Sequence, residues 1–341
     1  VEERGGHGIF FSTFALITLA ELGDKTQIAV AGLASTASAP AVWVGATLAL
    51  LITSWLGVWA GRTLLQRMSL GLVHRLSGVL FILFGLGEYP AAHTHLGQTI
   101  AYYHPQEHHD PLVLLRGSDA GVSALAYDSC CLWCLGYPDQ ALVRSREALA
   151  LARELGHPYT LADVLSFGGC LFNAMWQEAL ALKGAAEEMM QIARDMGFKA
   201  WLATGACYRG EALAMLGRLE EGLAQMRTGI AVRESRGTRC YLTGTCLTMA
   251  EAQAQAGRPG EALTTLAEAL AQVGKSEERH WEAKLYRLKG ELLLSQGDEA
   301  AAEASLQQAL AVARRQQAKM WELQAATSLS RLWQRQGKAD E

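Results

Sequence analysis

Gly217-Arg-Leu-Glu-Glu-Gly-Leu is followed 40 residues later by Gly257-Arg-Pro-Gly-Glu-Ala-Leu, and again after the same interval by Gly297-Asp-Glu-Ala-Ala-Ala-Glu. Gly337 continues the spacing, and Gly136-Tyr-Pro-Asp-Gln-Ala-Leu begins a related stretch upstream. Apolar residues between these glycines follow the spacing of one helix face. Glycine commonly occupies the left-handed position that ends a helix. The period therefore predicts a succession of helix pairs, in which each glycine ends one helix and the next helix starts directly after it.

A helix-turn-helix unit of about 40 residues is typical of tetratricopeptide-type repeats, with a slightly longer period than usual. We count about five repeats, preceded by a degenerate one at Gly87-Glu-Tyr-Pro-Ala-Ala. Because single pairs cannot bury their apolar faces, we expect a right-handed α-solenoid whose concave groove binds a peptide or another protein domain. The sequence stops at Gly337-Lys-Ala-Asp-Glu without a polar capping repeat, so we expect residues 89–341 to form a C-terminally truncated repeat domain.

The composition changes sharply before the repeats begin. Residues 5–87 contain few charges and many Leu, Ala, Gly, Val, Ile, Phe and Trp, whereas residues 139–341 are rich in Ala, Leu, Glu, Gln and Arg. The net charge of -4 and the pI near 6.2 give no reason to expect nucleic acid as a partner. We therefore expect an all-α chain of two parts, with a membrane module over residues 1–88 and soluble helices after it.

Three apolar segments make up the expected membrane module. Residues 9–34 and 41–61 are each long enough to cross a bilayer as a helix. The third segment, residues 76–86, covers barely half a bilayer. It reaches a full span only if residues 74–75 are added before it and residues 89–92 after it. We expect two to three transmembrane helices, with membrane lipid as a partner.

Basic residues indicate the orientation of these helices. Arg62, Arg67, His74 and Arg75 lie between the second and third segments, whereas the link at residues 35–40 carries no charge. The positive-inside rule then places the N-terminus in the cytoplasm, and three crossings would put the repeats outside. The seven cysteines, however, lack the spacing of a disulfide framework and indicate reduced thiols. Either the third segment does not cross, or the topology is dual, or the chain is not a natural unit. We expect an integral protein of the bacterial inner membrane, with the side of the repeat domain left open.

The sequence Glu21-Leu22-Gly23-Asp24-Lys25-Thr26 lies inside the first apolar segment. Ionisable groups at membrane depth are costly and typically mark ion pathways. We interpret the motif as an intramembrane cation site; the alternative is a soluble amphipathic helix with one charged turn. Glu21 and Asp24 are three positions apart and share a helix face. Their carboxylate oxygens suit hard cations such as Ca²⁺ and Mn²⁺.

The neighbouring residues fit this interpretation. Gly23 lets a second helix or an opened backbone approach, and Thr26 or Gln27 can add neutral oxygen ligands. Lys25 pairs with a carboxylate or closes the empty site. A desolvated carboxylate holds either a proton or a cation, and this opposition is what proton-coupled exchange requires.

The run Phe14-Ala-Leu-Ile-Thr-Leu-Ala-Glu-Leu-Gly-Asp-Lys-Thr-Gln resembles the signature of the calcium/manganese:proton exchangers related to transmembrane protein 165. Their hallmark is Glu-x-Gly-Asp-Lys-Thr/Ser. The stretch His74-Arg-Leu-Ser-Gly-Val-Leu-Phe-Ile-Leu-Phe-Gly-Leu resembles the third helix of the same repeat. The resemblance implies that Glu21 and Asp24 bind the cation and carry protons. The family is built from two such repeats of opposite orientation, so this single repeat implies a second copy or a partner subunit.

A second resemblance covers the chain from about Gly87 onwards. Leu132-Trp-Cys-Leu-Gly-Tyr-Pro-Asp-Gln-Ala-Leu and Leu285-Tyr-Arg-Leu-Lys-Gly-Glu-Leu-Leu-Leu-Ser-Gln-Gly are similar to the repeat region of large bacterial signalling proteins. In those proteins the repeats follow an AAA-type ATPase and often a nucleotide cyclase. The sequence contains neither a Gly-x4-Gly-Lys-Ser/Thr loop nor the paired aspartates of a cyclase. The resemblance therefore implies a regulatory or scaffolding arm, and we do not expect an enzyme.

Weaker patterns have structural explanations beside functional ones. Cys131 and Cys134 have the spacing of a redox pair, but they fall in a repeat helix, where small buried residues are expected. A histidine-rich group around the insertion at residues 104–118 indicates either a metal site or a polar surface loop: His93, His95, His104, His108, His109 and Asp110. Tryptophans that recur at similar positions of different repeats are interpreted as core: Trp133, Trp176, Trp201, Trp281, Trp321 and Trp333.

The leading hypothesis is a membrane protein with a single exchanger-type repeat for antiport of Ca²⁺ or Mn²⁺ against protons, joined to a tetratricopeptide-repeat interaction domain. No cofactor is expected beyond the transported ion. The alternative is a non-catalytic repeat scaffold, or the regulatory arm of a cyclase/ATPase-type signalling protein, with a membrane anchor.

Overall fold

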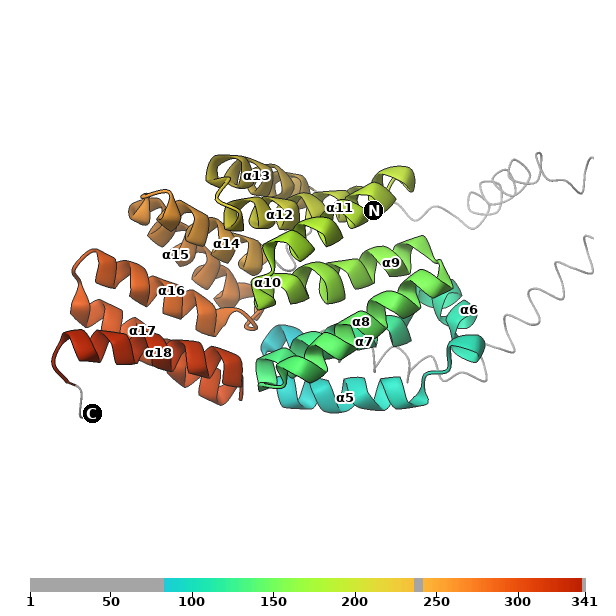
Figure 1. The fold of residues 1–341 in the computed structure, drawn as a ribbon, viewed down its shortest axis with the longest axis horizontal. Coiled ribbons are helices and arrows are strands. Elements are labelled where there is room, and N and C mark those ends of the chain that lie inside the picture. Colours follow the sequence, from blue (N-terminus) through green and yellow to red (C-terminus); the bar gives the residue numbers. More distant parts are fainter. Residues whose placement is uncertain (1–82, 236–241, 339–341) are drawn as a thin grey trace, which may run out of the picture. The chain divides into compact units, whose positions relative to one another are not determined.

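The computed structural model describes residues 83–235 and 242–338, and every regular element within these ranges is a helix (Figure 1). The described residues all belong to one compact unit, residues 75–341. The helices are α5 (Tyr89–Tyr102), α6 (Pro105–Arg116), α7 (Ala120–Leu135), α8 (Pro138–Leu155), α9 (Pro158–Val164), the π-helix η1 (Leu165–Leu171), α10 (Phe172–Trp176), α11 (Ala179–Asp195), α12 (Lys199–Met215), α13 (Leu219–Ser235), α14 (Leu242–Gln255), α15 (Pro259–Ser276), α16 (Glu282–Ser295), α17 (Glu299–Arg315) and α18 (Lys319–Arg335). Two apolar segments, 9–34 and 41–61, lie outside the described residues.

The turns at the repeating glycines are as the period predicts. Gly136, Gly217, Gly257, Gly297 and Gly337 follow the ends of α7, α12, α14, α16 and α18, and their φ angles lie between 73° and 93°. Glycine reaches this left-handed region without the steric cost that a Cβ atom would bring. The succession of helix pairs is therefore confirmed for the described repeats.

A second series of left-handed turns closes the opposite end of the helix pairs. Gly156 and Gly197 have φ angles of 67° and 70°, and Glu277 and Gln317 have φ angles of 56° and 53°. Because two of these four positions are not glycine, the composition alone does not reveal the series.

The insertion at 104–118 was expected to be a metal site or a surface loop, but it contains helix α6, which begins at Pro105. Proline suits the first turn of a helix, where its missing N–H leaves no bond unmade.

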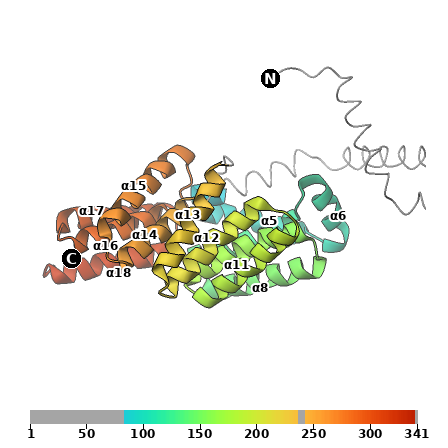
Figure 2. The same cartoon turned by 90° about the horizontal axis from the view of Figure 1, so that it is seen from above.

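Successive helices lie side by side, and Figure 2 shows α11 to α15 following one another in chain order. The first and last described repeats also meet, because α7 contacts α18 (Figure 1). The rings of Trp133 and Trp321 are 4.8 Å apart between their centroids. Tyr89 donates a hydrogen bond of 2.8 Å from its hydroxyl to the carbonyl oxygen of His280. Stacking of neighbours alone predicts none of these contacts.

The end of the third apolar segment lies in the core of this unit. Phe84 is 1% exposed, and its ring centroid lies 5.8 Å from that of Tyr127 and 5.2 Å from that of His280. The carbonyl oxygen of Gly85 accepts hydrogen bonds from the backbone N–H groups of Arg279, at 2.6 Å, and His280, at 3.1 Å. Residues about 195 positions away in sequence thus bury the last turn of the apolar segment.

The helical turn at residues 83–86 does not continue into residues 89–92, and a third transmembrane span stays a prediction. Gly87, with a φ of 78°, ends the helical turn at residues 83–86, and α5 begins separately at Tyr89. Phe84 is covered by protein side chains rather than being available to lipid. Among the helices of residues 83–235 and 242–338, none combines the length and the apolarity needed to cross a bilayer.

Replacing Phe84 by alanine should lower the free energy of unfolding of the repeat unit by about 3–5 kcal/mol, because the change leaves a cavity between two distant repeats. Urea unfolding of the full chain in detergent, followed by tryptophan fluorescence, measures this loss. Leu86→Ala is the matched control, since Leu86 is only half-buried and should cost less. Equal losses for the two variants would contradict a special role for the Phe84 contact.

Candidate functional site

The residues of the predicted cation motif lie outside the described residues: Glu21, Gly23, Asp24, Lys25, Thr26 and Gln27. Their arrangement stays a prediction. The histidine-rich group is described, and two of its members are held by carboxylates. His93 Nδ1 lies 2.6 Å from Asp128 Oδ1, and His109 Nδ1 lies 2.7 Å from Asp119 Oδ2. Within the described part of the chain, no three His, Cys, Asp or Glu side chains are grouped as a metal site.

Cys131 and Cys134 are free thiols buried in α7. Burial raises the pKa of each thiol well above its usual value, so both remain protonated and unreactive at neutral pH. Packing in a helix seam therefore accounts for them.

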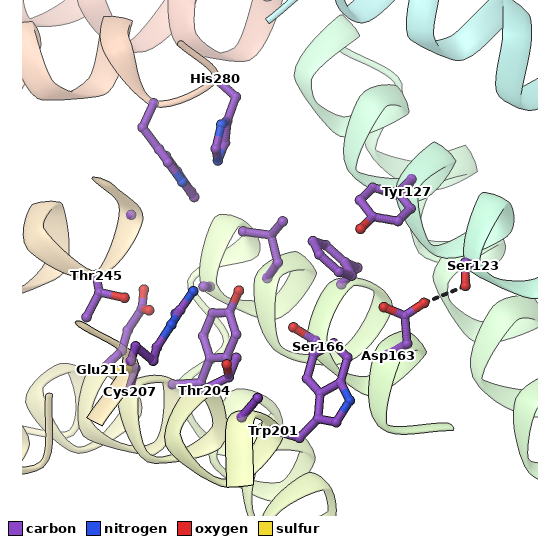
Figure 3. A pocket seen from close by; sticks show the side chains of 18 of the residues that line it. Ser123, Tyr127, Asp163, Ser166, Trp201, Thr204, Cys207, Glu211, Thr245 and His280 are labelled. Carbon is purple, nitrogen blue, oxygen red and sulfur yellow. Dashed lines mark hydrogen bonds between the residues drawn. The ribbon is translucent and has the colours of Figure 1, made fainter. Parts of the chain in front are cut away.

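The described repeats enclose a pocket of about 350 Å³ (Figure 3). This volume falls in the range that small-ligand sites occupy. Side chains from α7, α9, η1, α12 and α14 line it, together with His280, Trp281 and Lys284 at the start of α16. The pocket depends on the contact between the two ends of the repeats, because Tyr127 and His280 line it and also hold Phe84.

One side of the pocket carries Asp163, the penultimate residue of α9. Asp163 is 7% exposed, and its Oδ2 atom accepts a 2.5 Å hydrogen bond from the hydroxyl of Ser123. Its other carboxylate oxygen turns away from Ser123, towards the interior of the pocket (Figure 3). Ser166, also in the pocket lining, adds a hydroxyl three residues along.

The π-helix η1 shapes this wall. Side chains from neighbouring elements also bind carbonyl groups of this π-helix, a rare form of helix that is frequent at functional sites. Ser145 Oγ donates to the Gly168 carbonyl at 2.7 Å, and Asn173 Nδ2 donates to the Gly169 carbonyl at 2.7 Å. A Cβ atom at Gly168 would lie 3.3 Å from Cβ of Ala126, so glycine lets η1 approach α7 closely.

Aromatic rings form the body of the pocket. The rings of Tyr127 and Phe167 are 4.1 Å apart between centroids, and those of Tyr159 and Trp201 are 5.7 Å apart. Trp201 and Trp281 line the pocket although their repeated spacing indicated core positions. Trp201 is only half-buried, whereas Trp281 is 6% exposed. A regular position in the repeat identifies an inward-facing residue, but it does not distinguish a packed core from a pocket wall.

The opposite side carries two cations. Lys284 is 7% exposed and Arg233 is 6% exposed, and both line the pocket. The ammonium of Lys284 lies 3.1 Å from Glu251 Oε1 and 5.6 Å from the ring centroid of Trp281. A lysine between Ala283 and Leu285, on the buried side of a repeat helix, is the signal in the sequence that could have revealed this site.

Glu211 lies beside these cations. Burial raises its pKa from 4.5 to about 7, and the Lys284 ammonium opposes that rise. Burial also lowers the pKa of His280 to about 3, so its ring is neutral at physiological pH. The pKa of the Cys207 thiol is raised by burial, and the guanidinium of Arg233 partly offsets the shift. A neutral imidazole with so low a pKa and a protonated thiol are poor catalysts, whereas fixed charges beside aromatic rings are suited to binding.

Comparisons with known proteins divide the chain in the same two parts. Residues 9–91 match the family described as divalent cation/proton antiporter GDT1, and residues 245–315 match the tetratricopeptide repeat. The resemblance of the N-terminal part to cation/proton exchangers and the tetratricopeptide character of the second part are confirmed. The likeness of the repeats to the arms of cyclase/ATPase signalling proteins stays a prediction.

Three relatives illustrate the extent of the N-terminal match. GDT1-like protein 4 of Oryza sativa subsp. indica is 42% identical over 81 residues, which are 24% of this chain and 29% of that protein. GDT1-like protein sll0615 of Synechocystis is 40% identical over 24% of this chain and 39% of its own length. A Vibrio cholerae protein provisionally named a manganese exporter is 36% identical over 87 residues, 25% of this chain and 44% of its own. The chain thus spans less than half the length of these curated relatives.

Two solved structures match the repeats at low sequence identity. The apo form of RapI has 14% identity and a TM-score of 0.42, over 78% of this chain and 98% of that chain. A tetratricopeptide repeat protein from Parabacteroides merdae has 13% identity and a TM-score of 0.27, over 74% of this chain and 98% of its own.

Glu211→Gln should make the stability of the repeat unit less dependent on pH. Because the folded-state pKa near 7 exceeds the ordinary value of 4.5, the folded protein binds this proton more tightly than the unfolded chain. The resulting stabilisation is complete below the ordinary pKa and is lost as the pH rises through 7. The melting temperature should therefore be higher in the variant than in the unchanged protein at about pH 8, with a smaller difference at about pH 5. Glu154→Gln, at an exposed position of α8, is the control. An equal gain in its melting temperature at about pH 8 would contradict the attribution of this pH dependence to Glu211.

Proposed function

We propose that the chain is a membrane protein in which one exchanger-type repeat carries Ca²⁺ or Mn²⁺ against protons and the tetratricopeptide repeats form a ligand-binding arm. The observation that carries the transport proposal is the match of residues 9–91 to the divalent cation/proton antiporter GDT1 family. Glu21 and Asp24 fall inside that match and supply the oxygen ligands that hard cations prefer. In this proposal they bind the cation and the protons in turn.

A single repeat of three segments needs a partner to form a two-sided pathway. The chain spans 29% of the rice relative and 44% of the Vibrio cholerae relative, so it supplies only part of what those proteins contain. Repeats of opposite orientation meet around a central site in many transporters. We therefore propose that a second copy with reversed topology, or a partner subunit, completes the site in the bacterial inner membrane.

The pocket supports the second half of the proposal. Its buried charges and aromatic rings are held by contacts between distant repeats, and a pre-formed site of this kind binds a ligand without first being ordered. Phe84 connects the pocket to the proposed membrane module. Its ring contacts Tyr127 and His280, which line the pocket, and Phe84 itself belongs to the last turn of the third apolar segment. A second candidate function, a repeat scaffold held by a membrane anchor, is favoured by the same docking of residues 83–86.

Vesicles that contain the purified chain should take up Mn²⁺ or Ca²⁺ when a proton gradient is imposed, and Glu21→Gln should remove at least about nine-tenths of that uptake. The reason is that an amide can neither hold the proton nor carry the charge that pairs with the cation. Isotope uptake measures the flux. Glu88→Gln is the matched control, because Glu88 is exposed and makes no capping hydrogen bond at the start of α5.

The result also separates the two candidate functions. Uptake that survives in Glu21→Gln would contradict the role of this carboxylate. Absence of uptake in the unchanged chain, with insertion verified by protease protection, would refute transport by this chain alone and favour the anchored scaffold.

A further inference from the structure

The imidazole ring of His157 caps the N-terminus of α9, a helix that contributes to the pocket wall. The backbone N–H of Thr160 donates to His157 Nδ1 at 3.3 Å, and Thr160 Oγ1 lies 2.9 Å from the same nitrogen. Because a backbone N–H can only donate, His157 Nδ1 must accept, and it therefore carries no proton. The cap thus requires the neutral form of this histidine.

The hydroxyl of Thr160 also joins α9 to the start of α7. Thr160 is fully buried, and its Oγ1 accepts a 2.9 Å hydrogen bond from the backbone N–H of Asp119, the N-cap residue of α7. Since Oγ1 accepts this bond, its own hydrogen is available for His157 Nδ1, and the two bonds form one continuous chain. The state of the His157 ring therefore affects both the cap of α9 and the link to α7.

Two neighbouring side chains act on the charge of His157. The ring centroid of His109, in α6, lies 6.3 Å from that of His157, and His109 Nδ1 lies 2.7 Å from Asp119 Oδ2. Burial lowers the pKa of His157, and His109 adds to this shift, whereas Asp119 opposes it. Neither side chain comes from α8, η1 or α11, which also pack against α9. A carboxylate accepts hydrogen bonds, so a protonated His109 keeps its bond to Asp119, and His157 has the opposite requirement.

A proton on His157 Nδ1 would break this arrangement. A protonated ring donates from both nitrogens, so Nδ1 would face the N–H and the hydroxyl of Thr160 as a third donor. The hydroxyl can rotate and accept, but the backbone N–H cannot. That buried N–H would lose its partner, which costs free energy, and α9 would lose its cap.

We propose that His157 is an acid-sensitive switch: proton binding to its ring releases the first turn of α9 from α7 and loosens the pocket wall that this turn carries. Tyr159 belongs to this turn and lines the pocket, and its ring centroid lies 5.7 Å from that of Trp201, another lining residue. Asp163, near the other end of α9, is bonded to Ser123 of α7 at 2.5 Å. We therefore expect the release to be confined to the start of the helix.

The direction of the pH dependence follows from the lowered pKa. The released segment binds the proton with the ordinary histidine pKa of 6.5, whereas the capped form binds it more weakly. The cap therefore stabilises α9 fully above that pH, and the stabilisation is lost as the pH falls below it. Between pH 7.5 and pH 5.5, the equilibrium constant for opening of the first turn should rise by about fivefold.

Amide hydrogen exchange of the full chain in detergent, measured by mass spectrometry at the two pH values, tests this opening. After correction for intrinsic exchange rates, the protection of residues 159–162 should fall by about fivefold at pH 5.5. His157→Asn should remove the pH dependence, because the asparagine carbonyl accepts from the Thr160 N–H at either pH. His104→Asn, the same change at the exposed N-cap of α6, is the control and should keep the difference.

A second measurement does not depend on the folding of a variant. Deuterium exchange at the imidazole C2 position of the unchanged chain gives the pKa of each histidine, and that of His157 should lie below 6.5. A pKa at or above 6.5, or equal protection of α9 at the two pH values, would overturn the switch. A loss of protection at pH 5.5 that persists in His157→Asn would assign the effect to another group and would overturn it as well.

Discussion

The buried contact between the turn at residues 83–86 and the backbone at Arg279 and His280 is the constraint on which the described unit depends. Two backbone N–H groups converge on the Gly85 carbonyl, and the ring of Phe84 fills the space beside them. Leaving such buried groups without partners would cost free energy, so the contact fixes how the two ends of the repeat succession meet. A stack of repeats held only by neighbours would have no such closure.

The pocket follows from that closure. Its walls come from both ends of the succession: Tyr127 from α7, and His280 and Trp281 from the turn before α16. Glu211, Arg233 and Lys284 line the same pocket, and burial raises the pKa of Glu211 to about 7. Tyr127 and His280, which pack against Phe84, therefore also form part of the pocket wall.

The part of the sequence that resembles the exchangers adjoins the repeats at this point. Phe84 lies within residues 9–91, which match the antiporter family, and yet its side chain belongs to the core of the repeat unit. A ligand that contacts Tyr127 or His280 would act on a residue that holds the end of an apolar segment.

The sequence by itself determined the helix pairs, because left-handed turns favour glycine and Gly217, Gly257 and Gly297 mark them at a constant interval. It also determined the exchanger resemblance, which a short motif around Glu21 and Asp24 carries without any fold. Only the tertiary structure decided that residues 89–92 start a new helix and that Trp201 and Trp281 line a pocket. It also paired Asp163 with Ser123, and Lys284 with Glu251. Periodicity indicates which side of a helix faces inward. Contacts between distant repeats depend instead on the combined geometry of all the turns between them.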